Sequence, residues 1–457
     1  MPAVEKRGQI RYTVSKYHSG LEKNQMKNEY QTLYEAKRGT IEDCLDVIHS
    51  GDVVAFASAG SAPDTFLRQM HTIAPRVTDV HCIKGHEGSY PFITMPGMNG
   101  RINTGSFFFG RDLSAGMQMG NTSFIPADMC DYATFNFGHY PCNVFVAAAT
   151  PMDERGNLQV SLCMMYEDAA FSSADKVILE VNPHMPRVRG GLEINIRDVT
   201  RLVEADYPVA EVTAPAPTAE ELQVAKNVRE LMRDGDCIQI GIGALPNAIA
   251  REMMDLKDLG LHTEMATSAI GEMIRKGVIN GQRKNFKHGQ NLFIFAGGDE
   301  ALYQTLGENE ACRIVPAVYG ADPTIIMKND NMVSINTCVE MDLTGNICSE
   351  SIGPRIISGS GGAFDYVYGA LHSRGGRSIM AFTSRTKKGV SKIASMLQRG
   401  AAVTVPRNYA DYIVTEYGIA RLRGLSLEER AKALIRLAHP ECREELTRAA
   451  RELHYIL

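Results

Sequence analysis

The sequence predicts an α/β fold in which mostly parallel strands are covered by helices, arranged as two similar domains. Short apolar runs alternate with segments that carry apolar residues at helical spacing along the whole chain. A chain of 457 residues is also too long for one ordinary core. A segment with two prolines, residues 212–218, divides it into near-equal halves, and each half has an early strand followed by a turn of small residues.

The expected elements follow in chain order. Apolar runs predict buried strands at residues 52–57, 144–148, 177–181, 238–240, 292–296, 378–382 and 402–405. Helical spacing predicts helices at residues 40–48, 219–232 and 425–438. Acidic residues early in the first and last of these helices, such as Asp43 and Glu429, suit helix starts.

These elements define the expected domain organisation. Residues 1–28 are polar and lack the apolar core of a secretory signal, so we expect a floppy or partner-draped extension. Residues 29–211 form the first domain, residues 212–218 the linker, and residues 219–457 the second domain with the candidate catalytic residue.

Composition excludes several classes of protein. The net charge of −5 gives no indication of a nucleic-acid surface, and no run of eighteen apolar residues predicts a membrane span. The ten cysteines form no C-x-x-C pair, which argues against a zinc ribbon or a thioredoxin-type motif. We therefore expect most of them to be small buried hydrophobes in a reducing compartment, by default the cytoplasm.

The most informative stretch predicts a strand, a glycine turn and a helix over residues 237–250, followed by a second strand that carries Glu264. A lone glutamate is more often a surface or salt-bridged group than a nucleophile. Its apolar setting favours the second role here, because a poorly solvated carboxylate is a better nucleophile. His262 lies on the same side of the expected strand, where a hydrogen-bonded structural role is favoured over tuning of Glu264.

Two glycine-rich segments are candidate ligand sites. Gly241 and Gly243 lack the third glycine of a dinucleotide fingerprint, so a tight turn is the favoured interpretation, although free N–H groups at a helix start could hold a phosphate or an oxyanion. The second segment, residues 357–366, has several close glycines that allow backbone to approach a ligand. Within it we expect Asp365 to be a structural hydrogen-bond acceptor that fixes the loop.

From residue 29 to residue 452 the chain resembles the acetyl-CoA hydrolase/transferase family, and the closest resemblance is to butyryl-CoA:acetate and 4-hydroxybutyrate CoA-transferases. The segments that carry the resemblance are residues 51–53, 150–156, 180–187, 260–265, 351–353, 358–362 and 414–419. The resemblance implies two similar α/β domains of the CoA-transferase type, with the active site between them and Glu264 as the covalent nucleophile. It implies coenzyme A contacts from Gly241, Ile242, Gly243, Ala244, Leu245, Val339, Gly361 and Gly362. Lys388 is similar in position to a family lysine near the coenzyme, and Lys387 is the alternative because the loop is one residue short.

The implied activity is ping-pong transfer of coenzyme A from a short-chain acyl-CoA to an acid such as acetate, through a glutamyl-CoA thioester. Coenzyme A is then a co-substrate, with no tightly bound cofactor and no metal. The partners are acyl-CoA and small carboxylic acids, and we expect a homo-oligomer. Two alternatives stay open: an acyl-CoA hydrolase that uses the same site, and a non-catalytic acyl-CoA-binding protein. Departures from the family pattern at Ala363 and at residues 266–269 leave the acid substrate open.

Overall fold

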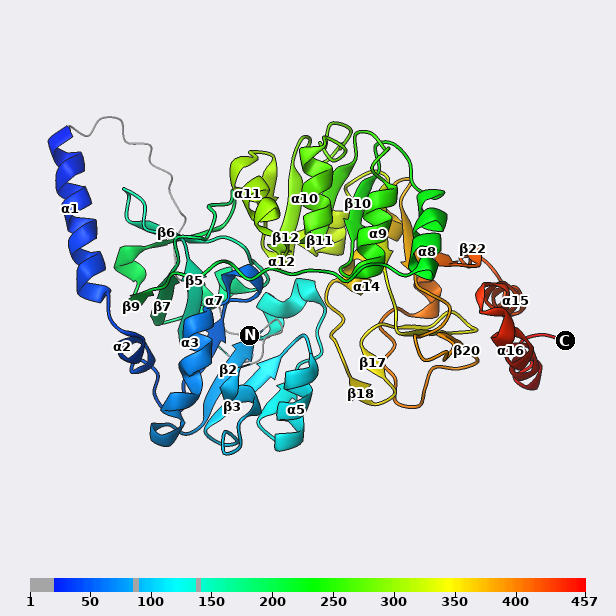
Figure 1. The fold of residues 1–457 in the computed structure, drawn as a ribbon, viewed down its shortest axis with the longest axis horizontal. Helices are drawn as coiled ribbons and strands as arrows, with labels where there is room; N and C mark the ends of the chain where they lie inside the picture. Colours follow the sequence, from blue (N-terminus) through cyan, green and yellow to red (C-terminus); the bar gives the residue numbers. More distant parts are fainter. Residues whose placement is uncertain (1–19, 85–89, 137–140) are drawn as a thin grey trace, which may run out of the picture.

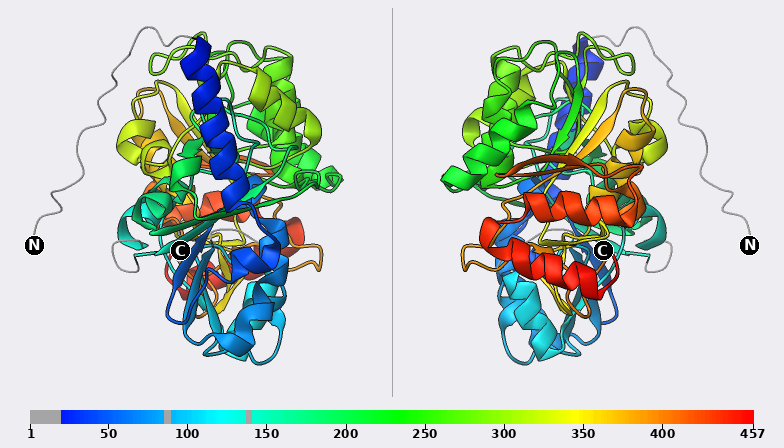
Figure 2. Two further views of the ribbon diagram at one scale, coloured as in Figure 1. Left: turned by 90° about the vertical axis from the view of Figure 1, so that its left-hand side faces the viewer. Right: turned by 90° about the vertical axis from the view of Figure 1, so that its right-hand side faces the viewer.

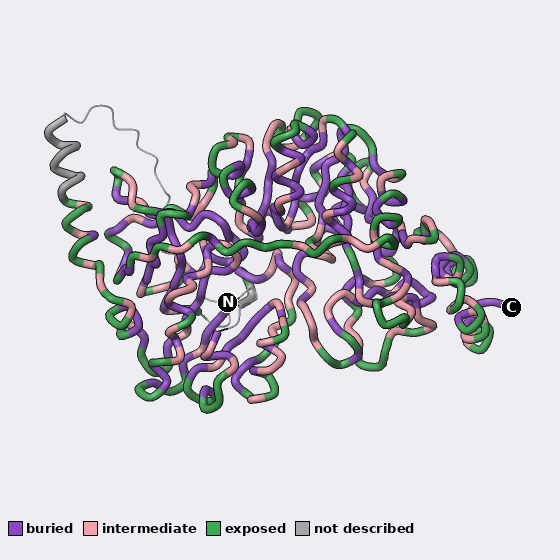
Figure 3. The backbone as a smooth tube through the Cα atoms, in the orientation of Figure 1, coloured by how far each residue is buried: buried purple, intermediate pink, exposed green. Residues whose placement is uncertain are grey.

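The computed structural model describes residues 20–84, 90–136 and 141–457 and arranges them as two halves, each built on a mainly parallel sheet (Figure 1). Strands and helices alternate along both halves, which confirms the predicted α/β class. Figure 3 shows the strands largely buried, with exposed backbone concentrated on helices and loops.

The first half contains a seven-stranded sheet in which every neighbouring pair is parallel. In spatial order its strands are β4 (Thr122–Phe124), β3 (Ile102–Ser106), β2 (Val80–Lys84), β1 (Val53–Phe56), β5 (Val144–Ala149), β7 (Lys176–Val181) and β9 (Arg201–Glu204). The accompanying helices are α1 (Gly20–Lys37), α2 (Ile41–Leu45), α3 (Asp64–Gln69), α4 (Pro91–Thr94), α5 (Arg111–Met119) and α7 (Glu167–Ser173). A two-stranded antiparallel sheet of β6 (Asn157–Val160) and β8 (Leu192–Asn195) extends this half.

The second half contains an eight-stranded sheet, parallel except for its last pair. Its spatial order is β13 (Cys312–Ile314), β12 (Asn291–Ala296), β11 (Gly260–Ala266), β10 (Cys237–Ile240), β14 (Met332–Asn336), β19 (Arg377–Ala381), β21 (Tyr412–Thr415) and β22 (Gly418–Arg421). The accompanying helices are α8 (Ala219–Arg229), α9 (Ala244–Glu252), α10 (Ser268–Arg275), α11 (Glu300–Glu308), α12 (Ala317–Gly320), α13 (Pro323–Ile326), α14 (Ala363–His372), α15 (Leu427–Leu437) and α16 (Pro440–Glu452). Short strands β15 (Glu340–Asp342), β16 (Ile347–Cys348), β17 (Ser351–Ile352), β18 (Arg355–Ile356) and β20 (Ile393–Ala394) complete it.

Capping explains where several helices begin. Thr40 and Asp43 form a reciprocal capping box at the start of α2, and Ser426 and Glu429 form another at the start of α15. The strand predicted at residues 402–405 is wrong. This segment pairs only through an isolated bridge between Val405 and Ile347, and Val403 is 49% exposed, so a β-prone composition was not matched by a neighbouring strand.

The two halves share a hydrophobic core. One buried cluster contains Phe145 of the first sheet together with Phe295 and Ile326 of the second half. Backbone hydrogen bonds also cross the boundary: Met164 N–H donates to Ile294 O at 2.9 Å, and Ala296 N–H donates to Leu162 O at 3.0 Å. The halves are therefore packed as one body. Figure 2 looks along its long axis, with α1 facing the viewer at one end and α15 and α16 at the other.

The segment that connects the halves has no regular secondary structure and crosses the middle of the molecule (Figure 1). Val212 N–H donates to Gly298 O at 3.0 Å, which holds the segment against the second half. At the other end of the chain, the predicted extension falls partly on residues 1–19, outside the described residues, and α1 crosses its expected boundary at residue 28.

Eight of the ten cysteines are buried and all ten are free thiols, in line with the predicted role as small hydrophobes. Among the described residues, none of the helices is long and apolar enough to span a membrane.

Candidate active site

Glu264 lies near the carboxyl end of β11, beside the glycine turn that ends the neighbouring strand β10. The strand, turn, helix and strand predicted around it are confirmed as β10, α9 and β11. Gly243 has a φ of +118°, which only glycine adopts readily, and this lets the chain turn sharply into α9. Because parallel strands end at one edge of the sheet, the turn and Glu264 face the same crevice.

A cavity of about 170 Å³ surrounds the Glu264 carboxylate. The second half contributes the glycine turn and the glycine loop, and the first half contributes Phe108, Met129, Tyr132 and Met165. The carboxylate therefore sits where the two halves meet.

The glycine loop contacts Glu264 directly. Gly362 N–H donates a hydrogen bond to Glu264 Oε2 at 3.1 Å. A Cβ atom added at Gly361 or Gly362 would lie 3.0 Å from a carboxylate oxygen of Glu264, and Gly361 has a φ of +55°. These positions need glycine because the backbone itself approaches the carboxylate.

A segment of the first half holds this loop in place. Met129 N–H donates to Gly361 O at 3.0 Å, and Ser360 Oγ donates to Ala127 O at 2.8 Å. Asp365, at the start of α14, accepts hydrogen bonds from Cys130 N–H and Sγ, both at 3.2 Å. Asp365 thus has the loop-fixing role that the sequence suggests, and its partner comes from the other half. We name these contacts between residues 127–130 and residues 360–365 the interdomain clamp.

Burial changes the charge state of both carboxyl groups. It raises the pKa of Glu264 to about 7, and the Gly362 hydrogen bond opposes this by stabilising the anion. Burial, followed by repulsion from Asp128, raises the pKa of Asp365 to about 8. At neutral pH Glu264 therefore exists substantially as a poorly solvated anion, which suits a nucleophile.

His262 serves the fold. Its ring is fully buried, with Nε2 2.8 Å from Gly320 O and Nδ1 2.9 Å from Asn329 Nδ2. Burial lowers the pKa of His262 to about 3, so the ring is neutral. The structural role favoured from the sequence matches this arrangement.

The other predicted coenzyme contacts fall into two sets, those whose backbone N–H group already has a partner and those whose N–H group is free. Gly241 N–H donates to Ile335 O at 3.1 Å and Val339 N–H donates to Cys348 O at 2.8 Å. Strand pairing therefore occupies both of these N–H groups. Within the described part of the chain, no partner is found for the N–H groups of Ile242 and Gly243. Ala244 and Leu245 are in the first turn of α9, where N–H groups lack helical partners.

The predicted lysine does not reach this cavity. Lys388 is exposed and lines neither the Glu264 cavity nor the polar cavity of about 420 Å³ near α8 and α16. That polar cavity is lined by the alternative, Lys387, and by Lys392, together with Glu416. Among residues 266–269 none lines the Glu264 cavity, whereas Ala363 does.

Two further cavity residues have no distinguishing pattern in the sequence. The Tyr132 hydroxyl and the Gln239 Oε1 atom are buried without a hydrogen-bond partner in the described structure, and both residues line the Glu264 cavity. Unpaired buried polar atoms are rare and are expected where a ligand supplies the partner. Among the described residues, no group of three His, Cys, Asp or Glu side chains could hold a metal ion.

Comparison with known proteins identifies the family. A model of the acetyl-CoA hydrolase/transferase N-terminal domain matches residues 22–217, and a model of the acetyl-CoA hydrolase/transferase C-terminal domain matches residues 298–450. Glu264 lies between these two ranges, so its assignment depends on the geometry described above.

Full-length relatives agree with the family models. The chain is 36% identical to the 4-hydroxybutyrate coenzyme A transferase of Clostridium kluyveri, over 92% of this chain and 98% of that protein. It is 34% identical to the succinyl-CoA:cyclohexane-1-carboxylate CoA transferase of Geobacter metallireducens, over 94% and 98%. Among solved structures, RipA from Yersinia pestis is similar with a TM-score of 0.88 and 34% identity, covering 93% of this chain and 100% of that one.

Proposed function

The chain belongs to the acetyl-CoA hydrolase/transferase family, and we propose that it is a CoA-transferase in which Glu264 carries coenzyme A between two carboxylic acids. The observation that carries this proposal is the placement of a carboxylate with a raised pKa in a cavity between the two halves, in contact with a backbone N–H from an opposing loop. The proposed substrates are an acyl-CoA and small carboxylic acids, with coenzyme A as co-substrate rather than resident cofactor.

The chemistry takes two steps in each direction. The Glu264 carboxylate attacks the thioester carbonyl of the acyl-CoA, which forms an acyl-glutamyl anhydride and releases the CoA thiolate. The thiolate then attacks the glutamyl carbonyl, which gives a glutamyl-CoA thioester and the free acid. An acceptor acid reverses these steps and leaves as the new acyl-CoA. One thioester replaces another, so the reaction needs no external energy source.

Backbone N–H groups would stabilise the tetrahedral oxyanions of these steps. Gly362 N–H already contacts Glu264 Oε2, and Ile242, whose N–H group is free, lines the same cavity. Each well-aligned donor is worth roughly 3 kcal/mol in the transition state. Gly241, Ala244, Leu245, Val339, Gly361 and Lys388 remain proposed coenzyme contacts; Gly241 and Val339 would act by close approach, since their N–H groups are occupied.

An acyl-CoA hydrolase would use the same nucleophile but admit water, and it would release CoA without an acceptor acid. A binding protein would show stoichiometric binding with no turnover. The homo-oligomer and the cytoplasmic location also remain predictions.

We expect the coenzyme to become covalently attached to Glu264 when the enzyme meets acyl-CoA without an acceptor acid. The half-reaction is close to thermoneutral, because one thioester replaces another, so a measurable fraction should accumulate. Intact-protein mass spectrometry would detect the CoA adduct, and peptide mapping should place it on the peptide with His262, Glu264 and Met265. Borohydride or hydroxylamine should then inactivate the enzyme only after acyl-CoA has been added.

Two controls make this experiment decisive. Acetate added before the reagent should discharge the intermediate and protect activity. A label on Cys237 or Cys338, or inactivation that needs no acyl-CoA, would mean that another nucleophile carries the chemistry.

The rate should fall in acid because only the ionised Glu264 attacks. With a pKa of about 7, kcat/KM for acyl-CoA should drop about tenfold per pH unit below pH 6 and level off above pH 8. Asp365, Tyr132 and Gly362 lie near this carboxyl group, and Asp128 in turn acts on Asp365 and Tyr132. An Asp365→Asn variant should therefore be titrated in parallel. An inflection that persists in this variant belongs to Glu264, whereas one that disappears belongs to Asp365.

The raised pKa of Glu264 should also appear in the pH dependence of the free energy of unfolding, which should change in the opposite direction to the rate. Between pH 4.5 and about 7 the folded protein holds a proton on Glu264 that the unfolded chain has lost, so this group lowers the free energy of unfolding as pH rises. The free energy of unfolding of Glu264→Gln should therefore rise relative to that of the wild type as the pH increases across this window. Equal pH dependence of the two unfolding free energies would contradict the raised pKa.

A further inference from the structure

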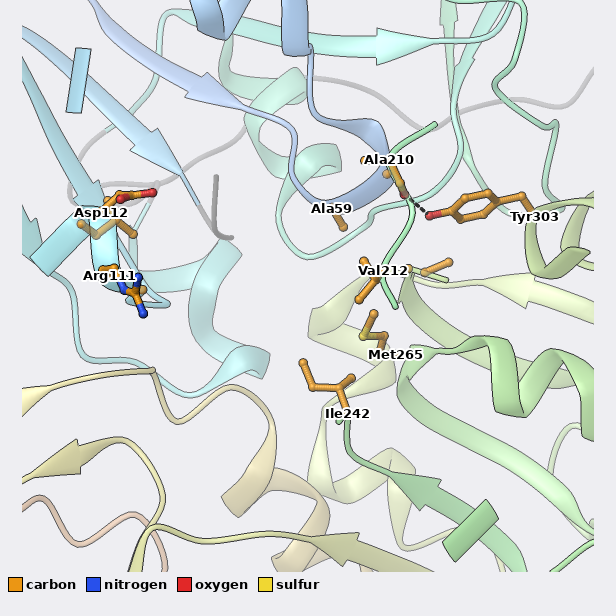
Figure 4. Close-up of a pocket in the computed structure, with 13 residues that line it drawn as sticks. Ala59, Arg111, Asp112, Ala210, Val212, Ile242, Met265 and Tyr303 are labelled. Carbon is orange, nitrogen blue, oxygen red and sulfur yellow. Dashed lines mark hydrogen bonds between the residues drawn. The ribbon is translucent and has the colours of Figure 1, made fainter. Parts of the chain in front are cut away.

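A second, larger cavity adjoins the Glu264 cavity. Its volume is about 480 Å³, and Ile242 and Met265 line both cavities. Figure 4 shows its walls coming from the first half at Ala59, from the connecting segment at Val212, and from the second half at Ile242 and Met265. A ligand whose reacting carbonyl lies at Glu264 can therefore extend into this space.

Large apolar side chains face this cavity with much of their surface uncovered. Val212 is 51% exposed and Ile242 is 45% exposed, although both line a cavity between two domains. Leu113, Ala296 and Met265 complete the apolar wall. Exposed apolar surface of this kind, gathered in a concave site, is typical of a binding pocket for an apolar group.

The polar groups of this cavity are few. The Tyr303 hydroxyl donates to Ala210 O at 2.6 Å and accepts from Gly298 N–H at 3.3 Å. Arg111 and Asp112, of opposite charge, lie across the cavity from Ile242 and Met265 (Figure 4). The end nearest Glu264 therefore offers no charged partner to a ligand.

The Glu264 cavity itself has several polar lining residues that the larger cavity lacks. Gln239, Asn336, Thr337, Ser349 and Ser358 line it, and Gln239 Oε1 is buried without a partner in the described structure. The pantetheine arm of coenzyme A carries two amides, which need hydrogen-bonding partners when they leave water. These polar residues suit this arm, and the apolar cavity suits a group that has no hydrogen bonds to make.

From this division we infer that the 480 Å³ cavity receives the hydrocarbon part of the acyl group. The inference rests on the proposed function and names its substrate class: neutral, apolar acids bulkier than acetate, including branched and cyclic ones. The cavity lies within the usual range of small-molecule sites and greatly exceeds what one methyl group fills. A carboxylate tail would lose its hydration beside Met265 and Ile242 without gaining a partner there.

A donor series tests the inference. With isotopically labelled acetate as acceptor, so that transfer from acetyl-CoA itself is also visible, kcat/KM should rise roughly tenfold or more from acetyl-CoA to butyryl-CoA and cyclohexanecarbonyl-CoA, because each added methylene finds apolar contact. Succinyl-CoA, of similar length to butyryl-CoA but charged at its end, should be the poorer donor. A preference for succinyl-CoA over butyryl-CoA would overturn the inference.

Two variants narrow the cavity from different walls. Val212→Phe adds a ring on the connecting segment, outside the core. Gly297→Ala places a Cβ atom 2.6 Å from Met265 Cε and 3.2 Å from Val212 Cγ2, which pushes both side chains into the cavity. Each should lower kcat/KM about tenfold or more for the bulky donors and less than threefold for acetyl-CoA. The matched control is Val318→Phe, since Val318 is 42% exposed but lines neither cavity.

The outcomes separate this inference from the proposed function. Equal losses for all donors in Val212→Phe and Gly297→Ala would place the coenzyme arm in this cavity and overturn the inference. Unchanged selectivity in both folded variants would overturn it as well. In either case a CoA adduct on wild-type Glu264 would leave the proposed function standing, whereas absence of the adduct with every donor would remove the proposed function itself.

Discussion

Replacing Glu264 with glutamine is expected to lower the rate of CoA transfer by at least about 10³-fold, because the amide cannot attack a thioester. The two side chains are nearly isosteric, and the Oε1 atom of glutamine can still accept the Gly362 hydrogen bond. The cavity should therefore keep its shape, and binding of free CoA should change little. Steady-state kinetics, isothermal titration with CoA and circular dichroism would measure the three quantities.

Glu308→Gln is a suitable matched control, since Glu308 is exposed at the end of α11 and lies outside both cavities. It should transfer CoA at the wild-type rate. Transfer by Glu264→Gln within tenfold of the wild type would remove Glu264 as the nucleophile.

Gly362→Val should reduce kcat by roughly 100-fold, the cost expected when an oxyanion donor is displaced. The new side chain would begin 3.0 Å from Glu264 Oε2 and 3.1 Å from the Tyr366 ring, so either the loop or the carboxylate must move. Gly362→Ala should lie between the wild type and the valine variant. Measuring kcat and KM separately distinguishes misalignment of the reacting groups from weaker acyl-CoA binding.

Gly307→Ala controls for the loss of a glycine, since it adds a methyl group on the exposed face of α11, 3.3 Å from Pro186. It should leave turnover unchanged. A folded Gly362→Val variant with normal kinetics would show that the loop has only a structural role.

Local patterns predicted the scaffold of the site well. The apolar run before Gly241, the glycine turn and the carboxylate in a second apolar run all lie within thirty residues, so short-range periodicity was enough to place Glu264 beside the turn. The same rules failed at residues 402–405, where a β-prone sequence meets no partner strand beyond one bridge. Whether a segment forms a strand depends on the presence of a neighbouring strand to pair with, as well as on the composition of the segment itself.

Contacts between distant residues were beyond the reach of local patterns. Cys130 and Asp365 are 235 positions apart, and only the packed halves bring them together. Tyr132 follows in the same segment, where nothing nearby in the sequence distinguishes it from a core tyrosine. The occupied N–H groups of Gly241 and Val339 likewise depend on which strands pair.

Because the interdomain clamp joins the two halves, the catalytic site is complete only while the halves are docked against each other. A fluctuation that separates residues 127–130 from the glycine loop removes the support of the Gly361 carbonyl and Asp365. Turnover is then proportional to the fraction of molecules in the docked state. Docking of the two halves would therefore act as a switch on turnover, since an undocked molecule lacks the loop position that places Gly362 N–H against Glu264 Oε2.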